Sequence, residues 1–328
     1  MVGVSISTVS RALHRPEMVD AETRERINVA ASALGYVPQG VGRALVSRRT
    51  RSVGAVVPRI GASAFAQTIE ALRHGLGKSN YTLLLAQPPI KEQADLRPLR
   101  TLIERGVDGI VLLGNDCPPA WLDLIAKNGL PVATIWADAG NALPGSIGFD
   151  NYAAGRQAAE HLLSLGHREF AFISGYLALN QRARQRYQGL LETIAAGGGR
   201  LSRELIIEAD YGFANGYQAT RRLLSRKLPF SALICGNDYL ALGAMAGLRE
   251  EGLRIPGDIS VMGFNDSEFA AFVDPPLTTI RFPSIEIGAA AAETLLAAIE
   301  SQEPMPPPQM LPTALVRRRS TGPAPVSE

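Results

Sequence analysis

Short apolar segments that alternate with helix-like segments are the feature that most limits how this chain can fold. Val53-Gly54-Ala55-Val56-Val57 is one of them, almost continuously apolar and ended by Pro58. Such a run is typical of a parallel strand covered on both faces, because neither face then needs polar residues. The repetition of strand and helix predicts an α/β fold with parallel sheets.

Two series of these units follow one another. The first has predicted strands at 53–57, 81–86, 109–113 and 130–136, and helices at 65–78, 99–105 and 121–128. The second has strands at 170–173, 205–207, 232–235, 259–262, 278–280 and 314–318, and helices at 152–165, 186–195, 216–225, 239–250 and 285–299. We therefore expect two doubly wound lobes with right-handed crossovers. Ligands of such folds bind beyond the carboxyl ends of the strands, which places the expected site in a cleft between the lobes.

Basic residues gather near the N-terminus. Residues 1–51 hold eight arginines and four acidic residues, a net charge of +4 in a chain whose total is +2. The remaining residues therefore carry −2, and an anionic partner is expected for the N-terminal segment alone. No apolar run is long enough to span a bilayer and no signal peptide begins the sequence, so a cytoplasmic protein is expected.

The signatures of common enzymes are missing. No GxGxxG motif follows the first strand, and neither GxxxxGK[ST] nor GxSxG occurs. The four histidines have no metal-binding spacing, and Cys117 and Cys235 match no zinc or CxxC pattern. We expect no cofactor, no metal and no catalytic activity.

A short helix is predicted at residues 5–13, with Ser5 as its N-cap. Val9, Ala12 and Leu13 form its apolar face. Its outward face carries Ile6, Ser7, Ser10 and Arg11. Small polar side chains and one arginine suit the DNA major groove, although the segment alone fits an ordinary capped helix better.

A second helix is predicted at residues 21–34, capped by Asp20 and ended by Gly35. Residues 38–51 follow, and their two glycines favour a flexible linker. The alternative is a helix that forms only on DNA, with Leu45 inserted between base steps in the minor groove.

Together these residues resemble the headpiece of the lactose/galactose repressor family. The matching landmarks are Gly3-Val4-Ser5, Thr8-Val9-Ser10-Arg11, Leu13, Val19, Thr23-Arg24, Leu34-Gly35-Tyr36-Val37-Pro38 and Ala44-Leu45. In that family a complete helix precedes the Gly-Val-Ser turn, whereas only Met1 and Val2 stand before it here. The resemblance thus implies a helix-turn-helix headpiece whose first helix is missing from this sequence.

The resemblance also implies roles for individual residues. Ile6 and Ser7 would read bases, Arg11 would contact a base or phosphate, and Leu45 would enter the minor groove. The implied DNA-binding residues are Ser5, Ile6, Ser7, Thr8, Ser10, Arg11, His14, Thr23, Tyr36, Ala44 and Leu45.

The rest of the chain resembles the effector-binding domain of the same family, which is similar to periplasmic sugar-binding proteins. The landmarks are Asn151, Gly155, 165–168, Arg186, Gly189, 235–238, 241–243, 255–261, 263–266 and 276–279. The implied effector-binding residues are Phe65, Trp136, Arg182, Arg186, Tyr211, Asn237 and Asn265. From its position after a strand, Asp238 is expected to cap the next helix.

The implied effector is a sugar or a sugar acid, with the acid slightly favoured. Arg186 is the strongest candidate, because a guanidinium pairs with a carboxylate through two hydrogen bonds, and Arg182 lies near it in sequence. Asn265 and Trp136 stand where many family members have acidic residues. Residues 147–151 resemble the gluconate-repressor branch.

We therefore expect a DNA-binding transcriptional regulator, most simply a repressor, acting as a homodimer on double-stranded operator DNA. The expected parts are a headpiece at 1–37, a hinge at 38–51 and an effector-binding domain at 52–328. Within that domain, one lobe is expected at 52–150 plus 282–311 and the other at 151–281 plus 312–328. The alternative is a sugar-binding sensor without DNA-binding activity, which the basic segment with Leu45 opposes.

Overall fold

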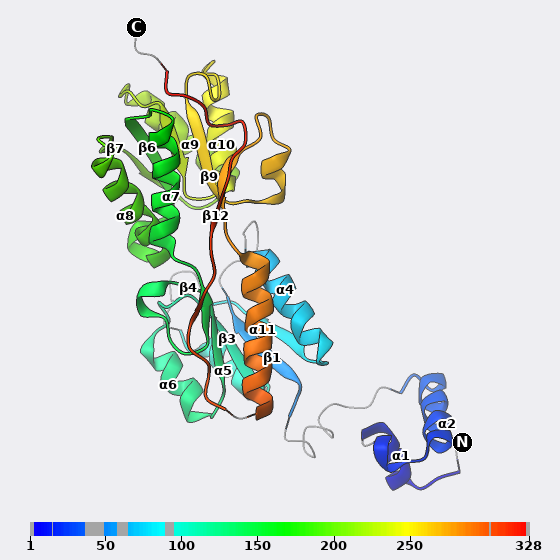
Figure 1. Cartoon of the computed structure of the whole chain (residues 1–328). Helices are drawn as coiled ribbons and strands as arrows, with labels where there is room; N and C mark the ends of the chain where they lie inside the picture. Colours follow the sequence, from blue (N-terminus) through cyan, green and yellow to red (C-terminus); the bar gives the residue numbers. More distant parts are fainter. Residues whose placement is uncertain are drawn as a thin grey trace.

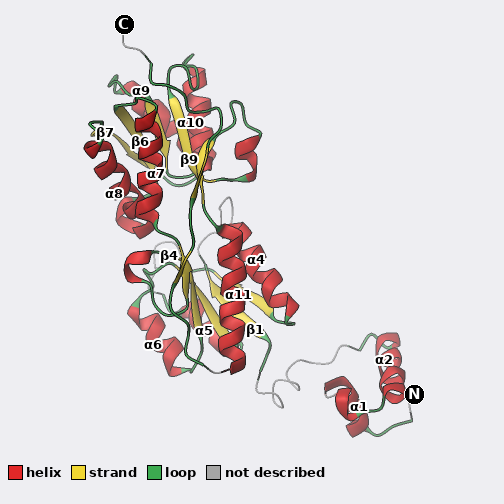
Figure 2. Ribbon diagram, in the orientation of Figure 1, coloured by secondary structure: helices red, strands yellow, loops and turns green. Residues whose placement is uncertain are grey.

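The computed structural model describes residues 3–14, 16–36, 49–57, 65–88, 95–301 and 303–325. Beyond the N-terminal helices, the chain forms two α/β lobes, each a sheet with helices on both faces (Figures 1 and 2). The predicted fold class is confirmed. No helix of the described residues is long and apolar enough to cross a membrane.

The first lobe, called the N-lobe, contains a parallel sheet with the order β11-β5-β4-β3-β1-β2. Its strands are β1 (Ser52–Val56), β2 (Thr82–Ala86), β3 (Gly109–Leu113), β4 (Val132–Ala137), β5 (Ser146–Gly148) and β11 (Gln309–Met310). Its helices are α4 (Phe65–Lys78), α5 (Arg97–Glu104), α6 (Pro119–Lys127) and α11 (Ser284–Ser301). The strands at β5 and β11 are missing from the sequence prediction.

The second lobe, called the C-lobe, has the sheet order β12-β10-β9-β8-β6-β7. Its strands are β6 (Glu169–Ser174), β7 (Arg200–Glu208), β8 (Ala232–Cys235), β9 (Ser260–Asn265), β10 (Thr278–Arg281) and β12 (Ala314–Val316). Its helices are α7 (Asn151–Ser164), α8 (Gln181–Ala196), α9 (Phe213–Ser225) and α10 (Asp238–Glu250). Only β12 runs antiparallel to its neighbour among the paired strands that the structure describes.

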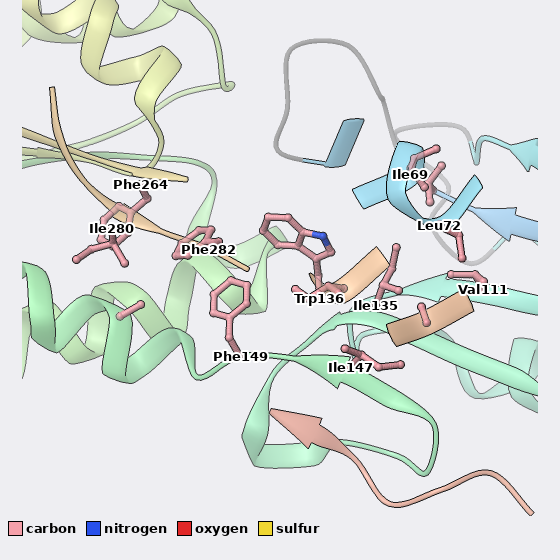
Figure 3. Close-up of a cluster of buried hydrophobic side chains, with 14 of the residues drawn as sticks. Ile69, Leu72, Val111, Ile135, Trp136, Ile147, Phe149, Phe264, Ile280 and Phe282 are labelled. Carbon is pink, nitrogen blue, oxygen red and sulfur yellow. The ribbon is translucent and has the colours of Figure 1, made fainter. Parts of the chain in front are cut away.

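The chain passes between the lobes three times, after β5, after β10 and after β11. The apolar core continues through these crossings, as Figure 3 shows. Phe149 and Phe282 lie on two of the crossing segments and stack with ring centroids 4.3 Å apart. Phe282 also packs on Phe264 of the C-lobe and on Trp136 of the N-lobe. The two lobes therefore share buried apolar side chains, which resist their separation.

Glycines allow the helices α7 and α8 to cross at close range. A Cβ at Gly155 would overlap the carbonyl of Arg186, and one at Gly189 would overlap the carbonyl of Tyr152. The obstacles are backbone atoms, which cannot rotate away. The position of Arg186 thus depends on a close backbone contact.

We expect Gly189→Ala to lower the free energy of unfolding by about 2 kcal/mol, because the added methyl forces the two helices apart. Gly77→Ala is the matched control: Gly77 is also helical, but a Cβ there meets nothing within 4 Å. That variant should be neutral or more stable by up to about 1 kcal/mol. Urea denaturation measures both, and equal effects would contradict the packing role of Gly189.

Candidate functional site

Arg186 is a buried cation at the boundary of the lobes. It lies on α8, which begins where the Asn180 side chain accepts a hydrogen bond from the Ala183 amide. Its guanidinium carbon is 5.5 Å from the ring centroids of both Phe264 and Phe282. These ring contacts hold the guanidinium by cation–π attraction and fix its plane. Burial lowers the pKa of the Arg186 guanidinium, while its interaction with the Tyr211 hydroxyl raises it.

A polar chain links Arg186 to the N-lobe. Its Nη1 donates to Asn151 Oδ1 at 2.6 Å, and Asn151 Nδ2 donates to Asp138 Oδ2 at 3.4 Å. Asn115 Nδ2 donates to the Asp138 carbonyl at 2.7 Å. Burial raises the pKa of the Asp138 carboxyl. Neither Asp138 nor Asn115 is among the effector-binding residues expected from the sequence. Asp138 directly follows β4 and Asn115 stands two residues after β3, and the carboxyl edge of the sheet brings such residues together.

Arg182 reaches from the C-lobe to the N-lobe. Its guanidinium carbon lies 5.8 Å from the ring centroid of Phe65 on α4. A Cβ at Gly114 would overlap its Nη1, so the Arg182 side chain lies directly against this position after β3, where a φ of +72° favours glycine. The Gln181 amide donates to Asp116 Oδ2 at 3.3 Å beside it. The start of α8 is therefore held against the N-lobe by charge and by hydrogen bonding.

Neither guanidinium group forms a direct salt bridge with a carboxylate of the described residues, although Asp138 lies near enough for its negative charge to act on both. Burial is the main cause that lowers the pKa of Arg182, and the positive charge of Arg186 lowers it further. Within the described ranges, every ion pair joins other residues: Glu70–Arg73, Asp95–Arg97, Arg156–Glu160, Glu169–Arg200, Arg254–Asp258 and Asp266 with Arg281 and Arg318. Arg186 is buried and Arg182 is half-buried, and two neighbouring cations without a direct salt bridge favour an anionic ligand.

Trp136 forms an apolar wall beside this site. Its indole Nε1 donates to Thr68 Oγ1 at 3.0 Å, and its ring meets that of Phe65 edge to face at 4.8 Å. The side chain is buried among aromatic rings (Figure 3). Because its only polar atom is already bonded, Trp136 offers a ligand an apolar surface and no hydrogen bond.

The other expected effector residues lie at strand ends. Tyr211 follows β7, and its hydroxyl accepts a hydrogen bond of 3.5 Å from Asn180 Nδ2. Asn237 Oδ1 accepts a hydrogen bond from the Leu240 amide at 2.9 Å and so caps α10. The prediction that Asp238 is the cap is wrong. Asp238 is instead the first residue of α10 and accepts hydrogen bonds from Thr279 Oγ1 and the Ser267 amide, both at 2.6 Å.

The buried carboxyl of Asp238 should make the stability of the protein depend on pH. Burial raises its pKa to about 7, although hydrogen bonds from Thr279 and Ser267 oppose this. A carboxyl whose pKa is higher in the folded state binds more protons there, so its contribution to stability is lost as the pH rises from about 4 to 7. Asparagine resembles the protonated acid and does not titrate. Between pH 5 and pH 8 the free energy of unfolding of the wild type should therefore fall by a few kcal/mol more than that of Asp238→Asn.

Urea denaturation of both proteins at each pH measures that difference. The histidines and other titrating groups are common to wild type and variant, so they cancel when the two are compared at the same pH. Parallel pH profiles for the two proteins would contradict this account of Asp238.

Asn265 lines a different part of the lobe boundary, together with Gln67 on α4 and Tyr239 on α10. It has a φ of +113°, an uncommon backbone conformation that asparagine tolerates better than most residues. The preceding residue, Phe264, faces Arg186. Successive strand residues point to opposite faces, which explains why Asn265 points elsewhere.

The N-terminal segment forms α1 (Ile6–His14), the 3-10 turn η1 (Pro16–Met18) and α2 (Ala21–Ala33). Ser5 caps α1 by accepting from the Thr8 amide at 3.1 Å, and Asp20 caps α2 by accepting from the Thr23 amide at 2.9 Å. Both caps confirm the sequence prediction.

The two faces of α1 are also as predicted. Ala12 is buried, and the outward face is exposed at Ile6, Ser7, Ser10 and Arg11. Ile6 is 90% exposed, so its whole side chain is accessible to a binding partner. Tyr36 is also exposed. Ala44 and Leu45, and the question of a hinge helix, lie outside the described residues.

The chain is similar to known regulatory proteins over nearly its whole length. Residues 1–39 match the model of bacterial regulatory proteins of the lacI family, and residues 159–321 match a periplasmic binding protein-like domain. The transcriptional repressor PurR of Glaesserella parasuis is 31% identical over 316 residues, which cover 96% of this chain and 92% of PurR.

Solved structures agree with this relationship. The regulator CelR in complex with cellobiose is 29% identical, with 97% of both chains covered and a TM-score of 0.73. The Lac repressor dimer bound to operator and the anti-inducer ONPF is 26% identical, with 98% of this chain and 96% of the repressor covered and a TM-score of 0.83.

A capped helix pair ahead of two ligand-binding α/β lobes defines a DNA-binding transcriptional regulator with a small-molecule site. The chain belongs to the LacI family of bacterial regulatory proteins. Its relatives are transcriptional repressors and not enzymes.

Proposed function

We propose that this protein is a homodimeric repressor whose affinity for operator DNA is controlled by a sugar acid bound between its lobes. The observation that carries the proposal is the pair of neighbouring guanidinium groups, the buried Arg186 and the half-buried Arg182, neither of which forms a direct salt bridge among the described residues. The protein would act in the cytoplasm, where operator DNA is found.

DNA binding is proposed for the exposed face of α1. Ile6 and Ser7 stand at the N-terminal end of the helix, where side chains of a recognition helix reach base edges. Arg11 follows about one turn later and is exposed, so it is free to contact a guanine or a phosphate. The likeness to the Lac repressor dimer bound to operator supports both the DNA target and the dimer.

The carboxylate group of the sugar acid is proposed to bind Arg182 and Arg186. The hydroxyl groups of the same ligand would form hydrogen bonds with Asp138 and Asn115. Phe65 and Tyr211 would pack against the ring or chain of the ligand. The likeness to the CelR–cellobiose complex supports a carbohydrate ligand. Arg182 of the C-lobe contacts Phe65 of the N-lobe, so a ligand that binds both residues would change the relative position of the lobes. That change would be passed through residues 38–51 to the headpieces.

The test is fluorescence anisotropy of the whole chain with labelled DNA from upstream of its own gene, at low salt. We expect sequence-dependent binding that Ile6→Ala and Arg11→Ala each weaken by about tenfold or more. D-gluconate should change the affinity, and D-glucose should change it less.

Two outcomes contradict different parts of the proposal. Failure to bind any such DNA, with ligand binding intact, would favour a sensor without DNA function. An equal response to D-glucose and D-gluconate would contradict the proposal that the effector is an acid, but not the proposal that the protein is a repressor.

A further inference from the structure

A cavity of about 540 Å³ lies on the outer side of the C-lobe, where its volume is within the range of small-molecule sites. It is formed by β7, the edge strand of the C-lobe sheet, and by the turn that follows α9 (Figure 1). That turn leads into the amino end of β8, whereas the boundary with the N-lobe lies beyond the carboxyl ends of the strands. The cavity is therefore separate from the site at Arg186. Its lining consists of Arg203, Glu204, Ile206, Arg226 and Leu228.

A bulge in β7 shapes this cavity. Leu201 pairs with Phe170 of β6 and Ile206 pairs with Phe172, so residues 202–205 of β7 lie opposite Ala171 alone. Arg203 and Glu204 stand within the bulge and are exposed. A bulge points side chains in directions that a regular strand does not allow. In this case it places Arg203 in one lining with Arg226, which comes from the turn after α9.

The two arginines of the lining act on the same carboxylate. Hydrogen bonds with its own backbone amide and with the Ser202 hydroxyl are the main causes that lower the pKa of Glu204, and the charges of Arg226 and Arg203 lower it further. The Ser202 hydroxyl donates to Glu204 Oε2 at 3.0 Å. In the part of the chain that the structure describes, neither arginine forms an ion pair. Both guanidinium groups are thus available to an anionic ligand.

The number of donors favours a phosphate group as that anion. One guanidinium can already satisfy both oxygens of a carboxylate, whereas a phosphate monoester carries nearly two charges and three acceptor oxygens. Two arginines therefore match a phosphate group better than a carboxylate. Glu204 reduces the net charge of the lining to +1, from two arginines and one glutamate, which suits one phosphate group more than a polyanion such as DNA.

The remaining lining residues are apolar. Leu228 is 40% exposed, and Ile206 is half-buried and packs against the apolar core. Apolar surface beside two cations is stabilised when the hydrocarbon part of a ligand covers it. The lining thus fits a ligand with a phosphate at one end and an apolar group at the other.

We propose that this cavity binds a small organic phosphate, with its phosphate group on Arg203 and Arg226 and its apolar part on Ile206 and Leu228. This goes beyond the proposed function, because it requires neither DNA nor the effector at Arg186. All the lining residues belong to the C-lobe, so the ligand can bind in whichever arrangement the two lobes adopt.

Isothermal titration of the whole chain with phenyl phosphate, in a buffer without phosphate, tests the proposal. Phenyl phosphate should bind saturably below about 10 mM and about tenfold more tightly than inorganic phosphate, because only the former covers Leu228. Arg203→Met and Arg226→Met should each weaken its binding at least about tenfold. Arg222→Met is the matched control, since Arg222 is also exposed and lies in the last turn of α9 but outside the lining.

A second variant tests the apolar part of the cavity. Leu228→Ala should weaken the binding of phenyl phosphate and leave that of inorganic phosphate unchanged. Arg203, Arg226 and Leu228 are exposed, so all three variants should fold. Their response to D-gluconate and their binding to DNA should equal those of the wild type, which separates this test from that of the proposed function.

Four results would overturn the proposal. The first is that phenyl phosphate does not bind saturably in that range. The second is that Arg222→Met weakens the binding as much as Arg226→Met does, which would show a general attraction of charges. The third is that Arg186→Met abolishes the binding, which would place the phosphate at the lobe boundary. The fourth is that Arg203→Met promotes aggregation without changing the affinity, which would assign the bulge to the protection of an edge strand.

Discussion

Replacing Arg186 with methionine should weaken the binding of D-gluconate at least about 100-fold, because two charge-assisted hydrogen bonds to a carboxylate are lost. Methionine keeps an apolar stem between Phe264 and Phe282, so the packing there is largely preserved. Arg186→Lys keeps the charge but not the planar pair of donors, and an intermediate loss is expected. Isothermal titration calorimetry measures all three affinities.

Arg156→Met is the matched control for the loss of one positive charge. Arg156 lies on α7 in an exposed ion pair with Glu160, at an N–O distance of 3.5 Å. Its removal should leave D-gluconate binding unchanged and cost little stability. If both variants bound D-gluconate equally well, Arg186 would not be part of the effector site.

The second large effect concerns Asp266, whose carboxylate joins two arginines from different segments. Its Oδ2 accepts from Arg281 Nε at 2.7 Å, and its Oδ1 accepts from Arg318 Nη2 at 2.6 Å. The Asp266 side chain is 8% exposed and that of Arg318 is 17% exposed, so this pair is largely removed from water. We expect Asp266→Asn to reduce the free energy of unfolding by about 3 kcal/mol, because it leaves the Arg318 charge without its partner.

Asp258→Asn provides the comparison, since Asp258 also pairs with an arginine. Its partner Arg254 is 78% exposed, and the pair joins residues four apart on the surface. Water stabilises such charges when the pair is broken, so a much smaller loss than that of Asp266→Asn is expected. Urea denaturation at pH 7 gives both values, and similar losses would show that burial does not set the strength of the Asp266 pair.

The sequence predicts the larger elements well, because buried parallel strands and capped helices have strong local signals. The helix at Phe65–Lys78 and the strands at Gly109–Leu113 and Ala232–Cys235 have the predicted bounds. The helix α8 begins at Gln181, five residues earlier than predicted, because its first turn is polar and is held by the Asn180 cap. The strands β5 and β11 have only three and two residues, too few to show a period.

The site could be predicted in part. Arg186, Arg182, Phe65 and Trp136 lie near one another, as the family resemblance implies. The partner residues Asp138 and Asn115 were not predicted, because their role depends on which strand ends become neighbours in the sheet. Asn265 faces another cavity, because side chains alternate in direction along β9 and that of Asn265 points away from Arg186. The residue type alone does not show which way a side chain points.

The three crossings between the lobes have a consequence for how the protein is made in the cell. The N-lobe needs α11 and β11 to finish its sheet and cover it, and the C-lobe needs β12 at the edge of its own sheet. A ribosome must therefore synthesise nearly the whole chain before either lobe has all its strands. The N-lobe sheet lacks its edge strand until residue 310 has emerged, and the C-lobe sheet lacks its own until residue 316 has emerged. During synthesis the neighbouring strands β5 and β10 therefore expose unpaired edges, which are sites of aggregation.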